Sequence, residues 1–399
     1  MSTPAYASAT PPPKASLRDL MPVGTAVRLA AAWGVVVLFL TVGRGWLADP
    51  IATPTAIACF VLLFATILYA AFGVVKEADH LAHALGEPYG TLILTLSIVS
   101  IEVILIAAVL LGPGETATIA RDSIFAVMMI ILNLVMGLCL VVGGLRYGEQ
   151  EYNSQGAIAY LSMIVLLAGV ALALPNVLSP GNGGFLPVQA VGVAVLTIAL
   201  YAAFLAMQMR GYRRFFVQPE FGSLSIPVSV PVERGEPDGV DAPKIALDMR
   251  AIVLRSIILI ALILPIVLLA HDMAILIDMG VQRAGAPLAV GGVLIAIIVF
   301  TPESITAVKA ALANEMQRAI NLCLGAFVST VGLTVPAVLT IGLLTGKTVT
   351  LGLGGLDLVL LAITLAISAL TFLGHRTSPV QGLVHLALFA IYGLLLFVP

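Results

Sequence analysis

The sequence predicts an all-α membrane protein with eleven transmembrane helices, arranged as one extra helix followed by two inverted five-helix repeats. Three observations support this prediction. The composition is far more apolar than that of a water-soluble protein, and the apolar residues gather in runs of membrane-spanning length. In addition, the two halves of the chain carry the same unusual acidic residue at equivalent positions.

The composition places the chain in a lipid bilayer. Of its 399 residues, 60% are hydrophobic and only 10% are charged, and the mean hydropathy is +1.11. Water-soluble proteins carry about 25% charged residues. Apolar runs longer than about 18 residues indicate membrane-spanning helices, and their continuous character excludes a transmembrane barrel. The net charge of −2 argues against nucleic acid as a partner.

Division of the apolar runs at glycine, proline and charge clusters gives the eleven expected spans. They cover residues 26–47, 53–75, 88–112, 120–146, 154–175, 186–210, 250–270, 286–310, 316–343, 350–373 and 377–398. The predicted regions are a disordered cytosolic tail, an extra transmembrane helix, a first repeat, an acidic cytosolic linker and a second repeat. These regions comprise residues 1–25, 26–47, 53–210, 211–249 and 250–399, respectively. The tail is polar and proline-rich, unlike a signal peptide.

Lysine and arginine residues predict the orientation, because they concentrate in cytosolic loops. With a cytosolic N-terminus and an external C-terminus, all but four of the 19 basic residues lie on or near the cytosolic side. The four others are Arg44, Arg121, Arg283 and Lys347. A missed or additional helix would erase this asymmetry, so the bias supports eleven spans.

The two blocks of five helices on either side of the linker form an inverted repeat. Because five is odd, the second block enters the membrane from the opposite side, as in many secondary transporters. The second helix of each block holds one acidic residue in an apolar run: Glu102 in LILTLSIVSIEVILI and Glu303 in VLIAIIVFTPESITAV. They are the only acidic residues deep within an expected span. Ionisable residues at this depth are costly and usually serve function.

Helical geometry places further polar groups beside the two glutamates. Thr95 shares a face of the third span with Glu102, and Thr306 lies on the side of the eighth span that carries Glu303. Pro302 removes a hydrogen bond from the eighth span, which either frees carbonyl groups to face an ion or makes an ordinary kink. Polar residues also interrupt the following helix of each repeat: Asn133, Asn321, Ser329, Thr330 and Thr334.

Two carboxylates at the membrane midplane predict coupled exchange. When both are ionised they repel each other at low dielectric, and this repulsion favours proton uptake. A hard cation with oxygen ligands can replace the protons, and Ca²⁺ suits such a site. Only near-neutral states cross the membrane at tolerable cost. The sequence contains no GxxxxGK[ST] motif for ATP, so the expected energy source is a proton gradient, with no cofactor.

Two stretches of the sequence resemble motifs of a known family. HALGEPYGTLILTLSIVSIEV, at 83–103, is similar to the first repeat motif of bacterial ChaA-type calcium/proton antiporters, in the cation/calcium exchanger superfamily. TPESITAVKAALANEMQRAINLCLGAFVSTVGLTVPAVL, at 301–339, is similar to the second motif. The resemblance covers about residues 70–399. It implies ten core helices in two inverted repeats, preceded by one extra helix, in a bacterial inner (plasma) membrane.

The resemblance also implies site residues. Glu102 and Glu303 would be the paired cation- and proton-binding carboxylates, with Asn133 and Ser329 facing them. Vacuolar relatives carry Gly-Asn shortly before each glutamate, where this chain has Ile98-Val99 and Val299-Phe300. Neutral ligands are therefore fewer or lie elsewhere. Bacterial relatives are associated with Na⁺ and K⁺ as well as Ca²⁺, so monovalent cation/proton exchange is the alternative to Ca²⁺/proton exchange.

Other polar groups leave two interpretations open. The linker is basic at its start and acidic afterwards, which fits a regulatory cation site or a solvated connection. His80 and His83, in KEADHLAHALGE at 76–87, are spaced to share a metal or to sense pH. The alternative is an amphipathic connecting helix with its polar residues in water. The resemblance favours a cytosolic mouth here, with Glu87 and His83 guiding cations.

Several isolated polar residues are expected to be structural. His271, Asp272 and Asp278 are expected in the outer loop between the seventh and eighth spans, where they attract cations or are simply solvated. His385 lies alone in the last span and is expected to be a packed, hydrogen-bonded residue. The three cysteines stand singly in apolar runs and are expected to be core residues: Cys59, Cys139 and Cys323.

An enzyme and a channel are the two alternatives to an exchanger. An intramembrane protease or lipid transferase needs an assembled set such as HExxH or paired catalytic aspartates, and the sequence contains none. A channel tolerates acidic residues in its pore but does not require an inverted repeat. The sequence therefore favours a secondary transporter over both.

Overall fold

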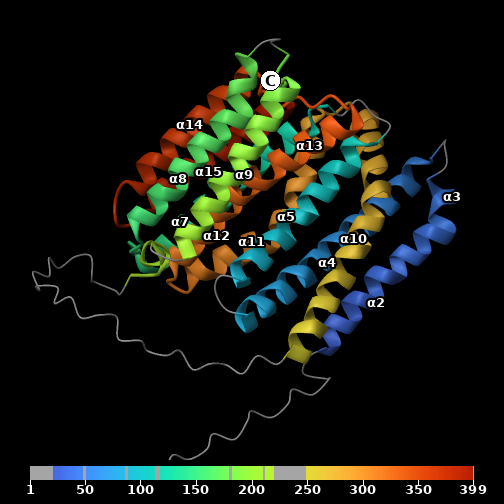
Figure 1. The fold of residues 1–399 in the computed structure, drawn as a ribbon, viewed down its shortest axis with the longest axis horizontal. Helices are drawn as coiled ribbons and strands as arrows, with labels where there is room; N and C mark the ends of the chain where they lie inside the picture. The colour runs from blue at the N-terminus through green and yellow to red at the C-terminus, as the bar shows by residue number, and fades with distance from the viewer. Residues whose placement is uncertain are drawn as a thin grey trace, which may run out of the picture.

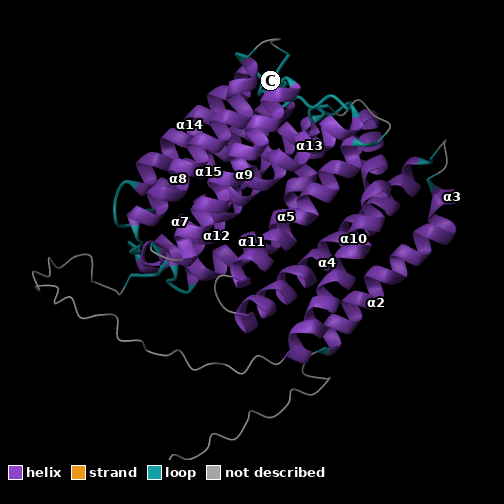
Figure 2. Ribbon diagram, viewed as in Figure 1, coloured by secondary structure: helices purple, strands orange, loops and turns teal. Residues whose placement is uncertain are grey.

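The computed structural model describes residues 21–47, 51–85, 89–112, 117–178, 182–209, 212–219 and 249–398. In this part of the chain the regular structure is helical (Figure 2), and strand-like pairing is limited to an isolated bridge between Glu151 and Arg376. Most of the expected tail, most of the expected linker, and Glu87 lie outside the described residues.

The described residues form eleven helical segments of membrane-spanning character, which confirms the predicted number. Ten are long and apolar enough to cross a membrane, and α5 supplies another apolar segment. The extra segment comprises α2 (Val23–Leu38), η1 (Phe39–Gly43) and α3 (Arg44–Trp46). The first repeat comprises α4 (Thr53–Leu85), α5 (Tyr89–Leu110), α6 (Ile119–Met128), η2 (Met129–Val135), α7 (Met136–Tyr147), α8 (Ser154–Ala168), η3 (Gly169–Ala173), η4 (Leu174–Asn176) and α9 (Pro187–Met209). After the short η5 (Arg213–Phe216), the second repeat comprises α10 (Met249–Ala284), α11 (Ala289–Leu312), α12 (Met316–Ser329), η6 (Thr330–Thr334), α13 (Val335–Thr345), α14 (Gly355–Phe372) and α15 (Pro379–Phe397).

The two repeats interlock through their first three segments. The first helices, α4 and α10, have 33 and 36 residues and pack against each other, with α2 alongside (Figure 1). The second helices cross into the opposite repeat: α5 packs against α12, η6 and α13, and α11 packs against α6, η2 and α7. This reciprocal packing is what an inverted repeat produces. It brings the helix that carries Glu102 against the third segment of the second repeat, and likewise Glu303 against that of the first.

Each third segment contains a π-helical turn at its centre. In the first repeat the turn is η2, which contains Asn133, and in the second it is η6, which contains Thr330 and Thr334. A π-turn inserts an extra residue into the helix, disturbs the regular hydrogen bonds and is frequent at functional sites. The polar interruptions that the sequence shows in these helices therefore coincide with backbone irregularities in the middle of the bundle.

The length of α10 corrects one prediction. His271, Asp272 and Asp278 lie within this helix and not in an outer loop. The helix continues because apolar residues recur at helical spacing beyond the expected end and are buried against the bundle; they are Met273, Ala274, Leu276, Ile277 and Val281. In the same way, α4 continues to Leu85, so the described part of the 76–87 segment extends a membrane helix.

Glu77 joins the extra helix to the first helices of both repeats. Its side chain is 1% exposed. It accepts hydrogen bonds from Thr25 Oγ1 on α2 at 3.1 Å and from Arg255 Nη1 on α10 at 2.9 Å. The indole of Trp33 on α2 also donates to the carbonyl of Ala261 on α10 at 3.0 Å. The interpretation that placed the polar residues of this segment in water is therefore wrong for Glu77.

The isolated polar residues of the core are packed as predicted. His385 is fully buried, and its two ring nitrogens lie 3.1 Å from Asn133 Oδ1 and 3.0 Å from Thr371 Oγ1. The three cysteines are free and buried. Hydrogen bonds thus satisfy His385 within the bundle, and the cysteines behave as small apolar residues.

Gly292 tests the close packing of α11 on α6. A Cβ atom added at Gly292 would lie 2.6 Å from backbone atoms of Asp122 and Ser123, whereas one added at Gly280, on α10, would meet nothing within 4 Å. We expect Gly292→Ala to lower the free energy of unfolding by about 1–3 kcal/mol, because the helices must separate. Gly280→Ala is the control, and its change should be neutral or stabilising by up to about 1 kcal/mol. Thermal unfolding of the detergent-purified variants measures both, and equal transition temperatures would contradict this packing.

Candidate functional site

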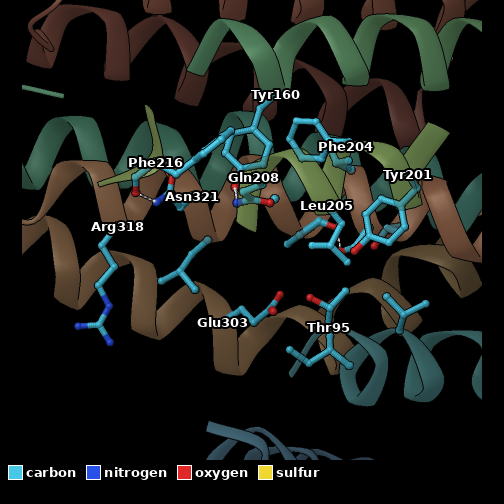
Figure 3. A pocket seen from close by; sticks show the side chains of 18 of the residues that line it. Thr95, Tyr160, Tyr201, Phe204, Leu205, Gln208, Phe216, Glu303, Arg318 and Asn321 are labelled. Carbon is cyan, nitrogen blue, oxygen red and sulfur yellow. Dashed lines mark hydrogen bonds between the residues drawn. The ribbon is translucent and has the colours of Figure 1, made fainter. Parts of the chain in front are cut away.

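A cavity of about 380 Å³ lies inside the bundle, between α5, α9, α11 and α12. We call it the glutamate cavity. Figure 3 shows Glu303 and Thr95 on one side of it, Tyr201 and Gln208 on the other, and Arg318 at one end. Its lining comprises Thr95, Ile98, Val99, Tyr160, Tyr201, Phe204, Leu205, Gln208, Phe216, Val217, Phe300, Glu303, Arg318, Asn321, Leu322, Gly325, Ala326, Val328, Ser329 and Thr330.

The glutamate cavity reaches one face of the molecule. We define the linker face as the end formed by residues 148–153, 212–219 and 313–315, which hydrogen bonds connect to one another and to the start of α12. Arg318 and Val217 line the cavity at this end, and their side chains are exposed. The cavity therefore extends from exposed side chains at the linker face to Glu303 inside the bundle.

The structure brings the two predicted carboxylates together. Glu102 on α5 is fully buried, and its Oε2 accepts a hydrogen bond of 2.9 Å from Thr330 Oγ1. Glu303 on α11 lines the cavity. The two carboxyl groups are close enough to interact electrostatically. Both therefore point into the protein interior and not toward lipid.

Several oxygen atoms around the two carboxyl groups have no hydrogen-bond partner. They are Glu102 Oε1, Glu303 Oε2 and Thr334 Oγ1, and all three are buried. Thr334 lies next to the Glu102 carboxyl group. Buried polar atoms in folded proteins nearly always have a partner, so this cluster has unused capacity for protons or for a hard cation. Carboxylate and hydroxyl oxygens are the ligands that Ca²⁺ and similar cations prefer.

A conventional metal centre is not part of this arrangement. Within the described residues, no group of three or more His, Cys, Asp or Glu side chains is placed to hold a metal ion. A cation bound between Glu102 and Glu303 would therefore need hydroxyl or carbonyl oxygens as further ligands. α11 remains helical through Pro302, which lacks the N–H that would bond the Ile298 carbonyl in a regular helix.

Three other residues predicted at the site line the glutamate cavity. Thr95 lies next to the Tyr201 hydroxyl. Ser329 directs its hydroxyl to the Ala326 carbonyl at 2.8 Å, and Thr330 donates to Glu102. These side chains come from α5, α12 and η6, so the cavity wall combines both repeats.

The remaining predicted residues lie elsewhere. Asn133 is fully buried in η2, but its side-chain nitrogen donates to Thr364 Oγ1 at 3.1 Å, toward α14 and α15 and outside the cavity lining. The Thr306 hydroxyl donates to the Pro302 carbonyl within α11, at 3.0 Å. Glu87 and the His83 side chain lie outside the described part of the structure.

Further polar residues line the cavity: Gln208 was not expected there, and Asn321 was noted in the sequence only as a polar interruption of its helix. Gln208 Nε2 donates to the Tyr160 hydroxyl at 2.6 Å, and Asn321 Nδ2 donates to the Phe216 carbonyl at 2.6 Å. Tyr201 and Gln208 are seven residues apart, which places them on the same face of α9. This polar stripe on an otherwise apolar helix was the available signal for that wall of the cavity.

A matched pair of substitutions tests the hydrogen bonding of Glu102. Thr330 donates to Glu102, whereas the buried hydroxyl of Ser368, on α14, has no partner. We expect Thr330→Val to lower the free energy of unfolding by about 1–3 kcal/mol, because a buried acceptor loses its donor. Ser368→Ala should be neutral or slightly stabilising, because no bond is lost. Thermal unfolding of the purified variants measures the difference, and the same loss from both would refute the assignment.

The sequence was compared with curated relatives. The chain is 35% identical to y4hA of Sinorhizobium fredii over 332 residues, covering 83% of this chain and 86% of the relative. It is 33% identical over 344 residues to the sodium-potassium/proton antiporter ChaA of Escherichia coli, covering 86% of this chain and 90% of that relative. A more distant match, at 24% identity, is the Ca²⁺/H⁺ antiporter ChaA of Bacillus subtilis, with 68% and 72% covered.

Solved structures share the fold. The native structure of YfkE superposes with a TM-score of 0.69 at 18% identity, covering 94% of this chain and 100% of that chain. The structure of the H⁺/Ca²⁺ exchanger CAX superposes with a TM-score of 0.60 at 16% identity, covering 92% and 87%. The family described as sodium/calcium exchanger protein matches residues 55–210 and 254–398, in the two repeats. The chain therefore belongs to the sodium/calcium exchanger protein family, whose members related to it are membrane transporters and not enzymes.

Proposed function

We propose that this multi-pass membrane protein is a secondary active antiporter that exchanges cytosolic Ca²⁺ for external protons at Glu102 and Glu303. The observation that supports this proposal best is that two carboxyl groups from equivalent helices of an inverted repeat lie within electrostatic range, each with one buried oxygen that has no hydrogen-bond partner. The proposed location is a bacterial plasma membrane, with the N-terminus in the cytosol and the C-terminus outside.

Charge neutrality couples the two transported species. Two ionised carboxylates next to each other in a low-dielectric interior are strongly unfavourable, and either protons or a divalent cation relieve the repulsion. Protons and Ca²⁺ therefore compete for the same oxygens. An empty, doubly negative site does not cross the membrane, so each turnover carries cation in one direction and protons in the other.

The shape of the protein supports alternating access. The glutamate cavity reaches the linker face. Toward the opposite face, Arg121 Nε donates to Asp122 at 2.8 Å and Arg121 Nη1 donates to the Gly352 carbonyl at 3.2 Å, next to a void of only about 20 Å³. In the proposed orientation the open side is cytosolic, where Ca²⁺ enters and protons leave. If each repeat adopted the conformation that the other has in this structure, the cavity would close at the linker face and open at the opposite face.

A monovalent cation is the second candidate substrate. Paired carboxylates with oxygen ligands suit Ca²⁺, and this favours the primary proposal. The relative of Escherichia coli, at 33% identity, is a sodium-potassium/proton antiporter, and this favours Na⁺ or K⁺. The mechanism at Glu102 and Glu303 is the same for both candidates.

Transport by amide variants tests the proposal. Everted membrane vesicles are given a proton gradient, Ca²⁺, Na⁺ or K⁺ is added in turn, and dissipation of the gradient is recorded. Vesicles with wild-type protein should lose the proton gradient when the transported cation is added. With Glu102→Gln or Glu303→Gln, the rate of loss should equal that of vesicles that lack the protein, because an amide cannot exchange a proton for a cation. Glu149→Gln, an exposed glutamate on the linker face, is the control and should match wild type. Wild-type exchange by either site variant would overturn the mechanism.

A further inference from the structure

Arg318 contributes a positive charge to the wall of a cation pathway. Among the described residues that line the glutamate cavity, it is the only other charged side chain besides Glu303. It lies at the end of the cavity that reaches the linker face (Figure 3), and 59% of its side chain is exposed. A cation that enters from this face therefore passes a guanidinium group before it reaches the carboxylates.

The charge of Arg318 is only loosely compensated. Its ion-pair partner is Glu315, three residues earlier, at 3.0 Å; the Glu315 side chain is 46% exposed and is not part of the cavity lining. The equivalent arginine of the first repeat, Arg121, is paired differently: its partner Asp122 is only 5% exposed and bonds it at 2.8 Å. Exposed ion pairs are weak and open readily, so Arg318 presents net positive charge to the cavity mouth.

Helix stability does not explain this arginine. Arg318 stands in the first turn of α12, which begins at Met316. A positive charge at the start of a helix opposes the helix dipole. In addition, Asn321 and Gln317, not Arg318, make the hydrogen bonds that attach the start of α12 to the segment around Phe216 and Gln218.

We propose that Arg318 sets the balance between divalent and monovalent cations at the linker-face entrance. The electrostatic work of bringing a cation past a fixed positive charge is proportional to the charge of the cation. Arg318 therefore disfavours Ca²⁺ twice as strongly as Na⁺ or K⁺ on the free-energy scale. Free ions in solution screen the effect over about 8–10 Å. This inference rests on the proposed function and refines its cation selectivity.

A charge series at position 318 tests the proposal. In vesicles at low ionic strength, kcat/KM is measured for Ca²⁺ and for Na⁺ with wild type, Arg318→Lys, Arg318→Gln and Arg318→Glu. For a charge about 10 Å from the ion path in water, Arg318→Gln should raise kcat/KM about twofold for Na⁺ and about fourfold for Ca²⁺. Arg318→Glu should square these factors, and Arg318→Lys should keep the wild-type ratio of the two cations. High salt should reduce every change.

Two further variants exclude a purely structural effect. Glu315→Gln removes the negative partner and should act in the opposite direction, lowering kcat/KM for Ca²⁺ more than for Na⁺. Arg146→Gln, an exposed arginine at the end of α7 outside the cavity lining, should match wild type for both cations. If position 318 variants change both cations by the same factor, or change neither while wild type exchanges normally, this inference fails and the proposed function stands. If wild type shows no proton-coupled exchange of any cation, the proposed function fails as well.

Discussion

The structure depends on the cost of holding two carboxyl groups together away from water. Glu102 is fully buried, and Glu303 lies within range of its charge. A pair of ionised carboxylates in this setting requires compensation by protons, by a cation or by hydrogen-bond donors. Thr330 donates a hydrogen bond to Glu102, and one oxygen of each carboxyl group has no partner. In the proposed mechanism the transported ions supply the remaining compensation, and this need couples their movements.

The two repeats position both carboxyl groups, but the side chains around Glu102 differ from those around Glu303. Glu102 faces the π-turn η6, which offers the hydroxyls of Thr330 and Thr334. Behind Glu303, a small void of about 10 Å³ is lined by apolar residues of η2, Ile131 and Val135, and by Cys323. The polar residue of η2, Asn133, turns away to His385 and Thr364. Equivalent helices of the two repeats thus place the glutamates in different environments: hydroxyl groups lie beside Glu102, whereas mainly apolar side chains lie behind Glu303.

Much of this arrangement was predictable from the sequence, because membrane helices follow composition and length. The eleven segments and the equivalence of Glu102 and Glu303 were visible as apolar runs and as two isolated acids. The direction of a side chain around a π-turn was not, because an inserted residue shifts the helical phase. The resemblance implied that Asn133 faces the site, but in η2 its side chain turns toward Thr364 and His385. The outer end of α10 was missed because His271, Asp272 and Asp278 look like loop residues, although one face of the helix remains apolar. The sequence showed Tyr201 and Gln208 on one face of α9, but it did not show which helices this face would meet.

Proton release on cation binding is the most direct test of the central claim. The purified protein is titrated with Ca²⁺, and separately with Na⁺ and K⁺, in weakly buffered detergent solution near neutral pH, while a pH indicator reports released protons. If the carboxyl groups of Glu102 and Glu303 trade protons for cation, the transported cation should release protons in proportion to its binding, and a variant with both glutamates changed to Gln should release none. Tight binding of the transported cation without proton release, or the same release from the double variant, would contradict the account.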